Sequence, residues 1–96
     1  MSREDIIRFL AEHKAVFAER YGVIKIGLFG SYVRGEACDD SDIDIAVELK
    51  SDQISDHYFS LLHFLEDTLG KKIDLGIISN IKPGIKKYVD REIMYV

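Results

Sequence analysis

The strongest constraint in the sequence is a pair of aspartates placed two residues apart inside the apolar segment DIDIAVEL. Apolar residues alternate there with polar or small ones, and this period of two predicts a strand. Side chains two apart on a strand point to the same face, so Asp42 and Asp44 project together while Ile43 and Ile45 enter the core. Two neighbouring carboxylates on a half-buried face repel each other unless a cation or hydrogen-bond donors neutralise them. The simplest such cation is an oxygen-ligated divalent ion.

The first half of the chain predicts one helix and one strand before these acids. Ser2 and Asp5 form the pattern of a capping box, and apolar residues at helical spacing predict a helix over about residues 3 to 20, which Gly22 ends. The segment VIKIGLF predicts a strand over residues 23 to 29, with Ile24, Ile26 and Leu28 on one face. The next segment, GSYVRGEA, is typical of a tight turn followed by one helical turn.

The second half predicts a long helix, a third strand and a last helix. An amphipathic stripe predicts a helix over residues 53 to 69, closed by Gly70, and KKIDLGII predicts a strand. Pro83 suits the first position of a helix over about residues 83 to 91, and EIMYV can add a short edge strand. The short connection between the first two strands allows antiparallel pairing, whereas the long helix before the third strand is a crossover that parallel pairing requires. We therefore expect an α/β (α+β) fold, ordered α-β-α-β-α-β-α, with a small mixed sheet flanked by helices.

Length and composition limit what else the chain can do. Ninety-six residues suit one domain, residues 1–96, with no room for a separate substrate domain. The net charge of −4 argues against direct DNA binding through a broad basic face, because that mode needs clustered lysine and arginine. The single cysteine, Cys38, excludes an internal disulfide and suits a cytoplasmic protein. The N-terminal segment lacks the apolar run of a signal peptide, and no stretch is long and apolar enough to suggest a membrane anchor.

Two further features point to phosphate chemistry. Asp74 interrupts the third strand as Asp44 interrupts the second, so three carboxylates on adjacent strands make a two-metal site plausible. Magnesium suits such a site because it binds a few carboxylates together with water and substrate phosphate. Gly30 has no Cβ, so a phosphate can approach its backbone, and Ser31 offers a hydroxyl and an amide N–H at a helix start.

Together these residues resemble a known signature. Gly30-Ser31, ten intervening residues, Asp42-Ile43-Asp44 and a later strand aspartate are similar to the motif of the DNA polymerase beta-type nucleotidyltransferase superfamily. The string GSYVRGEACDDSDIDIAVEL resembles in particular the minimal nucleotidyltransferase (MNT) domains that serve as antitoxins of helical HEPN toxins.

The resemblance implies both a reaction and a division of roles. Gly30 and Ser31 would contact the triphosphate, Asp42 and Asp44 would bind both of two Mg²⁺ ions, and Asp74 would bind the ion that activates the acceptor hydroxyl. The implied reaction moves AMP from ATP, with loss of pyrophosphate, to a tyrosine of a partner HEPN ribonuclease, which is thereby silenced. Apolar residues in the last helix and at the C-terminus also leave room for a homodimer or for a hetero-oligomer with that partner.

Each of these assignments has a plainer alternative. Asp42 and Asp44 can be solvated acids of a strand edge, Asp74 can be a surface residue, and Ser31 can simply cap a short helix. Arg34 and Ser41 complete the candidate phosphate contacts. The alternative for Arg34 is an ion pair with Asp39 or Asp40, and for Ser41 a local hydrogen bond at the strand start.

Two other functions fit the same residues. The chain can be a non-catalytic antitoxin that neutralises its partner by binding, or a nucleotidyltransferase that modifies a small molecule such as an aminoglycoside. The complete set of acids with the Gly-Ser pair favours an enzyme, because a domain used only for binding has no physical need for clustered carboxylates.

Overall fold

A mixed sheet of four strands forms the centre of the molecule. The computed structural model describes residues 1–50 and 54–96. The strands lie in the order β3-β2-β1-β4, where β1 spans Val23–Phe29, β2 Ile43–Leu49, β3 Ile73–Ile77 and β4 Met94–Tyr95. β1 pairs antiparallel with both β2 and β4, and β2 pairs parallel with β3. The pairing directions expected from the connection lengths and the expected edge strand are confirmed.

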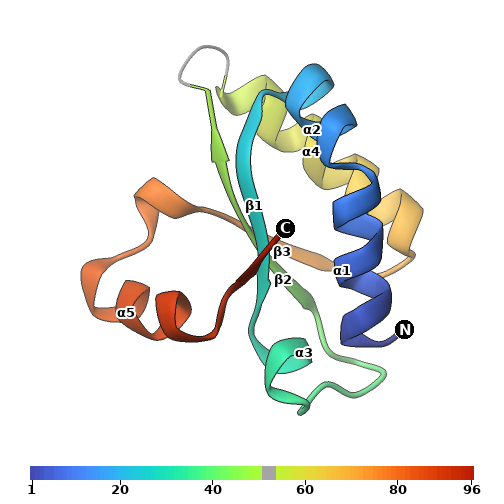
Figure 1. Ribbon diagram of the computed structural model, residues 1–96, viewed down its shortest axis with the longest axis vertical. Coiled ribbons are helices and arrows are strands. Elements are labelled where there is room, and N and C mark those ends of the chain that lie inside the picture. The colour runs from blue at the N-terminus through green and yellow to red at the C-terminus, as the bar shows by residue number, and fades with distance from the viewer. Residues whose placement is uncertain (51–53) are drawn as a thin grey trace.

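The helices lie on both sides of this sheet (Figure 1). α1 (Arg3–Glu12), α2 (Lys14–Tyr21) and α4 (Ile54–Leu69) cover one face, where α1 and α2 pack on β1 and α4 packs on β2 and β3. α5 (Pro83–Glu92) lies on the other side, and α3 (Ser31–Arg34) follows the end of β1. A short 3₁₀ helix, η1 (Ile78–Asn80), precedes α5. The expected start of the long helix at residue 53 lies outside the described residues. No helix among the described residues is both long and apolar enough to cross a bilayer.

The first expected helix is in fact two helices. The capping box of Ser2 and Asp5 is present, and Gly22 ends α2 in the left-handed conformation with φ of 67°. Between the helices, His13 leaves helical geometry with φ of −100° and ψ of 5°. Its ring Nδ1 lies 2.9 Å from the carbonyl oxygen of Phe9, and the ring stacks between the aromatic side chains of this region. The prediction of a single helix over residues 3 to 20 was therefore wrong, because the backbone departs from helical geometry at His13.

The face assignment of β1 also needs correction at one residue. The pairing of β1 with β2 shifts register between Val23 and Lys25, as a β-bulge does. This shift turns Ile24 outward, so that 56% of it is exposed, whereas Ile26 and Leu28 stay buried. Val23 takes the place expected for Ile24 in the core. Regular alternation predicts the wrong face wherever an extra residue enters a strand.

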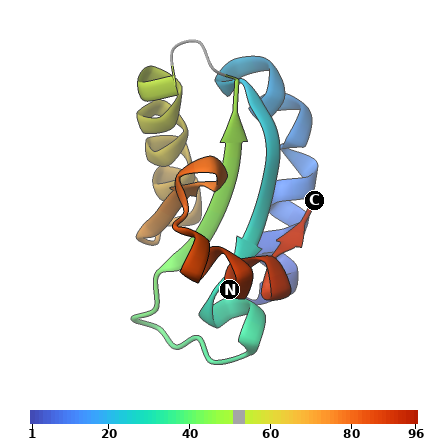
Figure 2. The ribbon, with the colours of Figure 1, turned by 90° about the vertical axis from the view of Figure 1, so that its left-hand side faces the viewer.

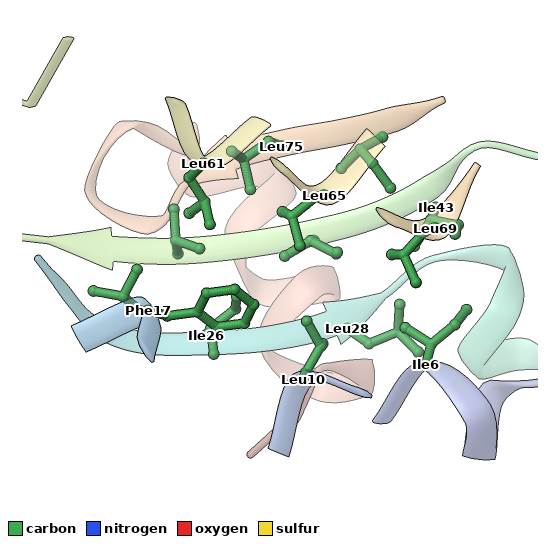
Figure 3. Close-up of a cluster of buried hydrophobic side chains, with 14 of the residues drawn as sticks. Ile6, Leu10, Phe17, Ile26, Leu28, Ile43, Leu61, Leu65, Leu69 and Leu75 are labelled. Atoms are coloured by element: carbon green, nitrogen blue, oxygen red, sulfur yellow. The ribbon is translucent and has the colours of Figure 1, made fainter. Parts of the chain in front are cut away.

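The core lies between the sheet and the three helices that cover it (Figure 3). Phe17 from α2 and Leu65 from α4 meet the inward side chains of the strands, among them Ile43 and Ile45. Both isoleucines are fully buried, as the alternation in β2 predicts. The core thereby fixes which face of β2 carries Asp44.

We expect the β-bulge to separate the effects of two otherwise similar substitutions. Ile26→Ala should lower the free energy of unfolding by about 3 kcal/mol because it leaves a cavity in the core. Ile24→Ala removes the same atoms from an exposed position and should change it by no more than about 0.5 kcal/mol. Urea denaturation of both variants measures the difference. Equal losses in the two variants would contradict the bulged register.

Candidate functional site

Two carboxylates lie side by side where β2 and β3 begin. Asp44 and Asp74 are direct partners in the parallel register of these strands, and Phe29 of β1 lies opposite Asp44 on its other side. Side chains of paired residues project from the same face of a sheet, so both acids point away from the helical core. Asp44 is partly buried and Asp74 is exposed. The predicted meeting of these two acids is therefore confirmed in the backbone register.

The neighbourhood of Asp44 makes its carboxylate harder to ionise than an ordinary aspartate. Burial raises its pKa from the usual 3.8 to about 6, and the negative charge of Asp74, a hydrogen bond with Asp74 and the charge of Asp42 act in the same direction. The Arg34 guanidinium opposes the shift but does not cancel it. Ionisation of both carboxylates is unfavourable unless a cation beside them offsets their repulsion. This electrostatic situation is the one expected of an oxygen-ligand site for a divalent ion.

Asp42 lies at the edge of this pair. It precedes β2, it is partly exposed, and its carboxylate lies 4.0 Å from the Nζ atom of Lys72. Within residues 1–50 and 54–96, no three acidic, histidine or cysteine side chains already converge as a metal cage. The structure thus brings Asp44 and Asp74 together, and the shared role of Asp42 stays a prediction.

Gly30 is needed here for a reason that the sequence did not reveal. Its backbone has φ of 81° and ψ of −152°, a region that only glycine adopts readily. A Cβ atom on Gly30 would collide with the carboxylate of Asp44. The missing side chain therefore makes room for a carboxylate of the protein itself, where the sequence suggested room for a phosphate.

Ser31 follows as the first residue of α3. The first N–H groups of a helix have no partner within the helix, so the Ser31 amide stands next to its hydroxyl at the end of β1. The chain then turns back through Val33 and Arg34, whose amides donate to the Gly30 carbonyl over 3.1 and 3.2 Å. Gly30 and Ser31 thus form a tight corner beside Asp44.

Ser41 makes the local contact that was its alternative assignment. Its hydroxyl accepts a hydrogen bond of 2.9 Å from the backbone N–H of Cys38. The same hydroxyl lies 3.5 Å from the Cys38 sulfur, and this side-chain hydrogen bond is the main cause that lowers the pKa of the Cys38 thiol. A role for Ser41 in phosphate binding stays a prediction.

Arg34 is held by two carboxylates, and neither is the expected Asp39 or Asp40. Its Nε atom donates to both oxygens of Glu36 at 3.1 Å, and Nη1 donates to both oxygens of Glu92 at 3.1 Å. Glu92 stands at the end of α5 and also accepts the N–H of Gly30 over 2.9 Å. Glu92 is a site residue that the sequence did not predict, because nothing in its sequence neighbourhood indicates a contact with residues so far away in the chain.

The comparison with known families agrees with this geometry. The nucleotidyltransferase domain family matches residues 10–96 of the chain. The protein belongs to this family. The resemblance inferred from the Gly-Ser and Asp-Ile-Asp motif is thereby confirmed.

Several known proteins resemble this nucleotidyltransferase in sequence or structure over most of the chain. The protein adenylyltransferase MntA of Thermococcus cleftensis is 45% identical over 96 residues, which cover 100% of this chain and 97% of that protein. A solved structure described as a minimal nucleotidyltransferase is 30% identical, with a TM-score of 0.82 over 98% of this chain and 95% of its own. A toxin-antitoxin crystal structure with AMP-PNP has a TM-score of 0.70 at 23% identity, over 88% of this chain and 69% of its own. That last likeness concerns the fold alone.

We expect Gly30→Ala to destabilise this nucleotidyltransferase by about 3 kcal/mol or more, because strain and collision act together. Gly35→Ala is the matched control, because Gly35 also has a positive φ, 74°, but open space around its Cβ position. It should cost only about 1 kcal/mol. An Asp44→Ala background removes the carboxylate but keeps the Cβ of residue 44, so the Gly30→Ala penalty should shrink by about 1 kcal/mol or more. Urea denaturation of the four variants tests this, and an undiminished penalty would contradict the contact.

The raised pKa of Asp44, about 6 against a usual 3.8, predicts how stability depends on pH. The folded state holds this proton more tightly than the unfolded state, so the contribution is greatest below about pH 4 and is lost as the pH rises through about 6. The loss should be on the order of 2 kcal/mol after partial solvent screening. Asp44→Asn should remove this dependence and be the more stable protein near pH 8. Urea denaturation with a chelator present measures both proteins, and identical pH profiles would refute the assignment.

Proposed function

We propose that this nucleotidyltransferase is an antitoxin. It transfers AMP from ATP to the hydroxyl group of a tyrosine on a partner toxin, a HEPN ribonuclease. The observation that supports this most strongly is the Asp44–Asp74 pair, which lies directly beside the Gly30-Ser31 corner. A cation site next to the amide and hydroxyl of Ser31 suits a triphosphate. The close relationship to the adenylyltransferase MntA supports AMP as the transferred group and a protein as the acceptor.

The carboxylates fit magnesium as the resident ion. Their donors are oxygen atoms only, their mutual repulsion is relieved by a cation, and two or three protein ligands are as many as Mg²⁺ commonly takes beside a nucleotide. In the proposal Asp42, Asp44 and Asp74 hold two ions. These would neutralise the phosphate charge and polarise the attacking and leaving oxygens.

The residues of the chain then have separate tasks. Ser31 binds the triphosphate through its amide and hydroxyl, and the corner at Gly30 holds Ser31 beside Asp44. Arg34 adds positive charge near the tail, and Ser41 fixes the loop that leads into β2. The acceptor oxygen bonds to the α-phosphorus while the bond from this phosphorus to the oxygen bridging to the β-phosphate breaks, and pyrophosphate leaves. Asp74, the exposed acid of the pair, takes the proton of the attacking hydroxyl.

The partner supplies the acceptor hydroxyl of the reaction. We propose that residues 1–96 act as one domain, alone or as a homodimer, and that the toxin presents the acceptor hydroxyl. Because the reaction consumes ATP, we place the protein in the cytoplasm. A toxin-antitoxin complex of the same fold, solved with AMP-PNP, supports both a toxin partner and a nucleotide ligand.

The purified protein is incubated with Mg²⁺, labelled ATP and the protein encoded beside it. We expect label from α-labelled ATP to appear on the partner, and no label from γ-labelled ATP. Asp44→Asn should lower the rate by a factor of about 10³ or more, because it removes a ligand of the site. Label retained on a gel measures the transfer. Glu48→Gln is a matched control, because Glu48 lies on the same strand, exposed and away from the acid pair.

The outcomes separate the proposal from its alternatives. Neutralisation of the partner in cells by Asp44→Asn as well as by the wild-type protein would mean that binding suffices and transfer does not matter. Label on a purified aminoglycoside, with none on the partner, would assign a small-molecule acceptor instead.

A further inference from the structure

Glu92 joins three segments that are distant in the sequence. It is the last residue of α5, and its carboxylate reaches the backbone N–H of Gly30 and the guanidinium of Arg34. Gly30 precedes it by 62 residues and Arg34 by 58. Figure 2 shows α5 in front of the sheet, beside α3. The carboxylate of Glu92 thus lies behind the corner that the proposed function assigns to the triphosphate.

The Gly30 amide is therefore occupied. Its N–H donates to Oε1 of Glu92 over 2.9 Å, while the space at its Cα is filled by Asp44. One protein carboxylate therefore holds the amide of Gly30, and another fills the place of its side chain. With Gly30 fixed in this way, Ser31 is left as the residue of the corner that presents its amide and hydroxyl to a ligand.

Glu92 is itself held in place by the strand that follows it. A Cβ on Gly27 would come within 2.8 Å of Ile93 and 2.9 Å of Tyr95, so the missing side chain lets the C-terminal segment lie against β1. Tyr95 pairs with Gly27, and the Val96 amide donates to the Ile26 carbonyl over 3.1 Å. β4 therefore anchors the end of α5 to the same strand that ends at Gly30.

The two carboxylates on Arg34 are not equivalent. The Glu92 side chain is 23% exposed, whereas that of Glu36 is 56% exposed. A shielded ion pair is screened less by solvent than an exposed one, and Glu92 alone also binds Gly30. Glu36 therefore touches Arg34 without touching the corner and offers an internal comparison.

We propose that Glu92 is a positioning residue for nucleotide binding: its carboxylate holds the Gly30 amide, and through it Ser31, in the conformation that receives the triphosphate. This role rests on the proposed function. It acts through the corner and requires no contact between Glu92 and the nucleotide. If Glu92 acted only through its negative charge, it would repel the phosphates and weaken nucleotide binding. Removal of its carboxylate would then strengthen nucleotide binding. The positioning role predicts the opposite.

Four proteins test this role: the wild type, Glu92→Ala, Glu92→Gln and Glu36→Ala. Calorimetric titration with Mg²⁺ and AMP-PNP gives the Kd, and amide hydrogen exchange by NMR gives the protection of Gly30. Glu92→Ala should weaken AMP-PNP binding by about tenfold, because only a fraction of the molecules then holds the competent corner. It should also speed Gly30 exchange by about tenfold or more.

The two other variants isolate the cause. Glu92→Gln keeps an oxygen that accepts the Gly30 N–H, so its Kd should stay within about threefold of the wild type. Glu36→Ala removes a carboxylate from Arg34 but none from Gly30, so its Kd should stay within about twofold. A loss of affinity as large in Glu36→Ala as in Glu92→Ala would overturn the role assigned to the Gly30 contact.

The remaining outcomes distinguish this inference from the function on which it rests. Equal or tighter binding by Glu92→Ala, with a wild type that binds AMP-PNP, overturns the positioning role and leaves the proposed function standing. A wild type that binds no AMP-PNP, with Gly30 exchange still faster in Glu92→Ala, overturns the proposed function and supports the hold of Glu92 on the corner.

Discussion

The repulsion between Asp44 and Asp74 is the interaction on which the rest of the site depends. Parallel pairing of β2 with β3 places the two carboxylates side by side, and the buried isoleucines on either side of Asp44, Ile43 and Ile45, prevent β2 from turning Asp44 away. A pair of this kind stores unfavourable free energy in the folded protein, which a bound cation can release. In the proposed function this pair is the site of a divalent cation, and without the ion the repulsion lowers the stability of the fold.

Only a few residues shape the corner beside the acid pair. The corner at Gly30 is shaped by protein carboxylates on two sides, Asp44 in place of a side chain and Glu92 on the amide. Arg34 balances part of this charge, since its guanidinium opposes the raised pKa of Asp44. Three segments distant in the sequence, at Gly30, Asp44 and Glu92, thus meet at one corner of the small sheet.

The sequence predicted the features that depend on local pattern. Alternation around Ile43 and Ile45 placed Asp44 outside the core, connection lengths gave the strand directions, and the apolar segment around Asp74 indicated its strand. The family motif then added its roles. The errors arose where one residue breaks a period: His13 interrupts a helix, and a bulge turns Ile24 outward. Glu92 could not be predicted, because its contacts join segments far apart in the sequence. The true reason for Gly30, a carboxylate beside its Cα, is likewise a tertiary contact.

The pKa of Asp44, measured from its side-chain carboxyl ¹³C shift by NMR with and without Mg²⁺ and AMP-PNP, tests most directly whether the acid pair binds a cation. In the free protein we expect a pKa of about 6, raised by burial and by Asp74. With the ion and nucleotide bound, the value should fall below about 4, because a cation beside the carboxylate favours its charged form. An ordinary pKa in the free protein, or one unchanged by Mg²⁺ and AMP-PNP, would contradict the claim that this pair forms the cation site.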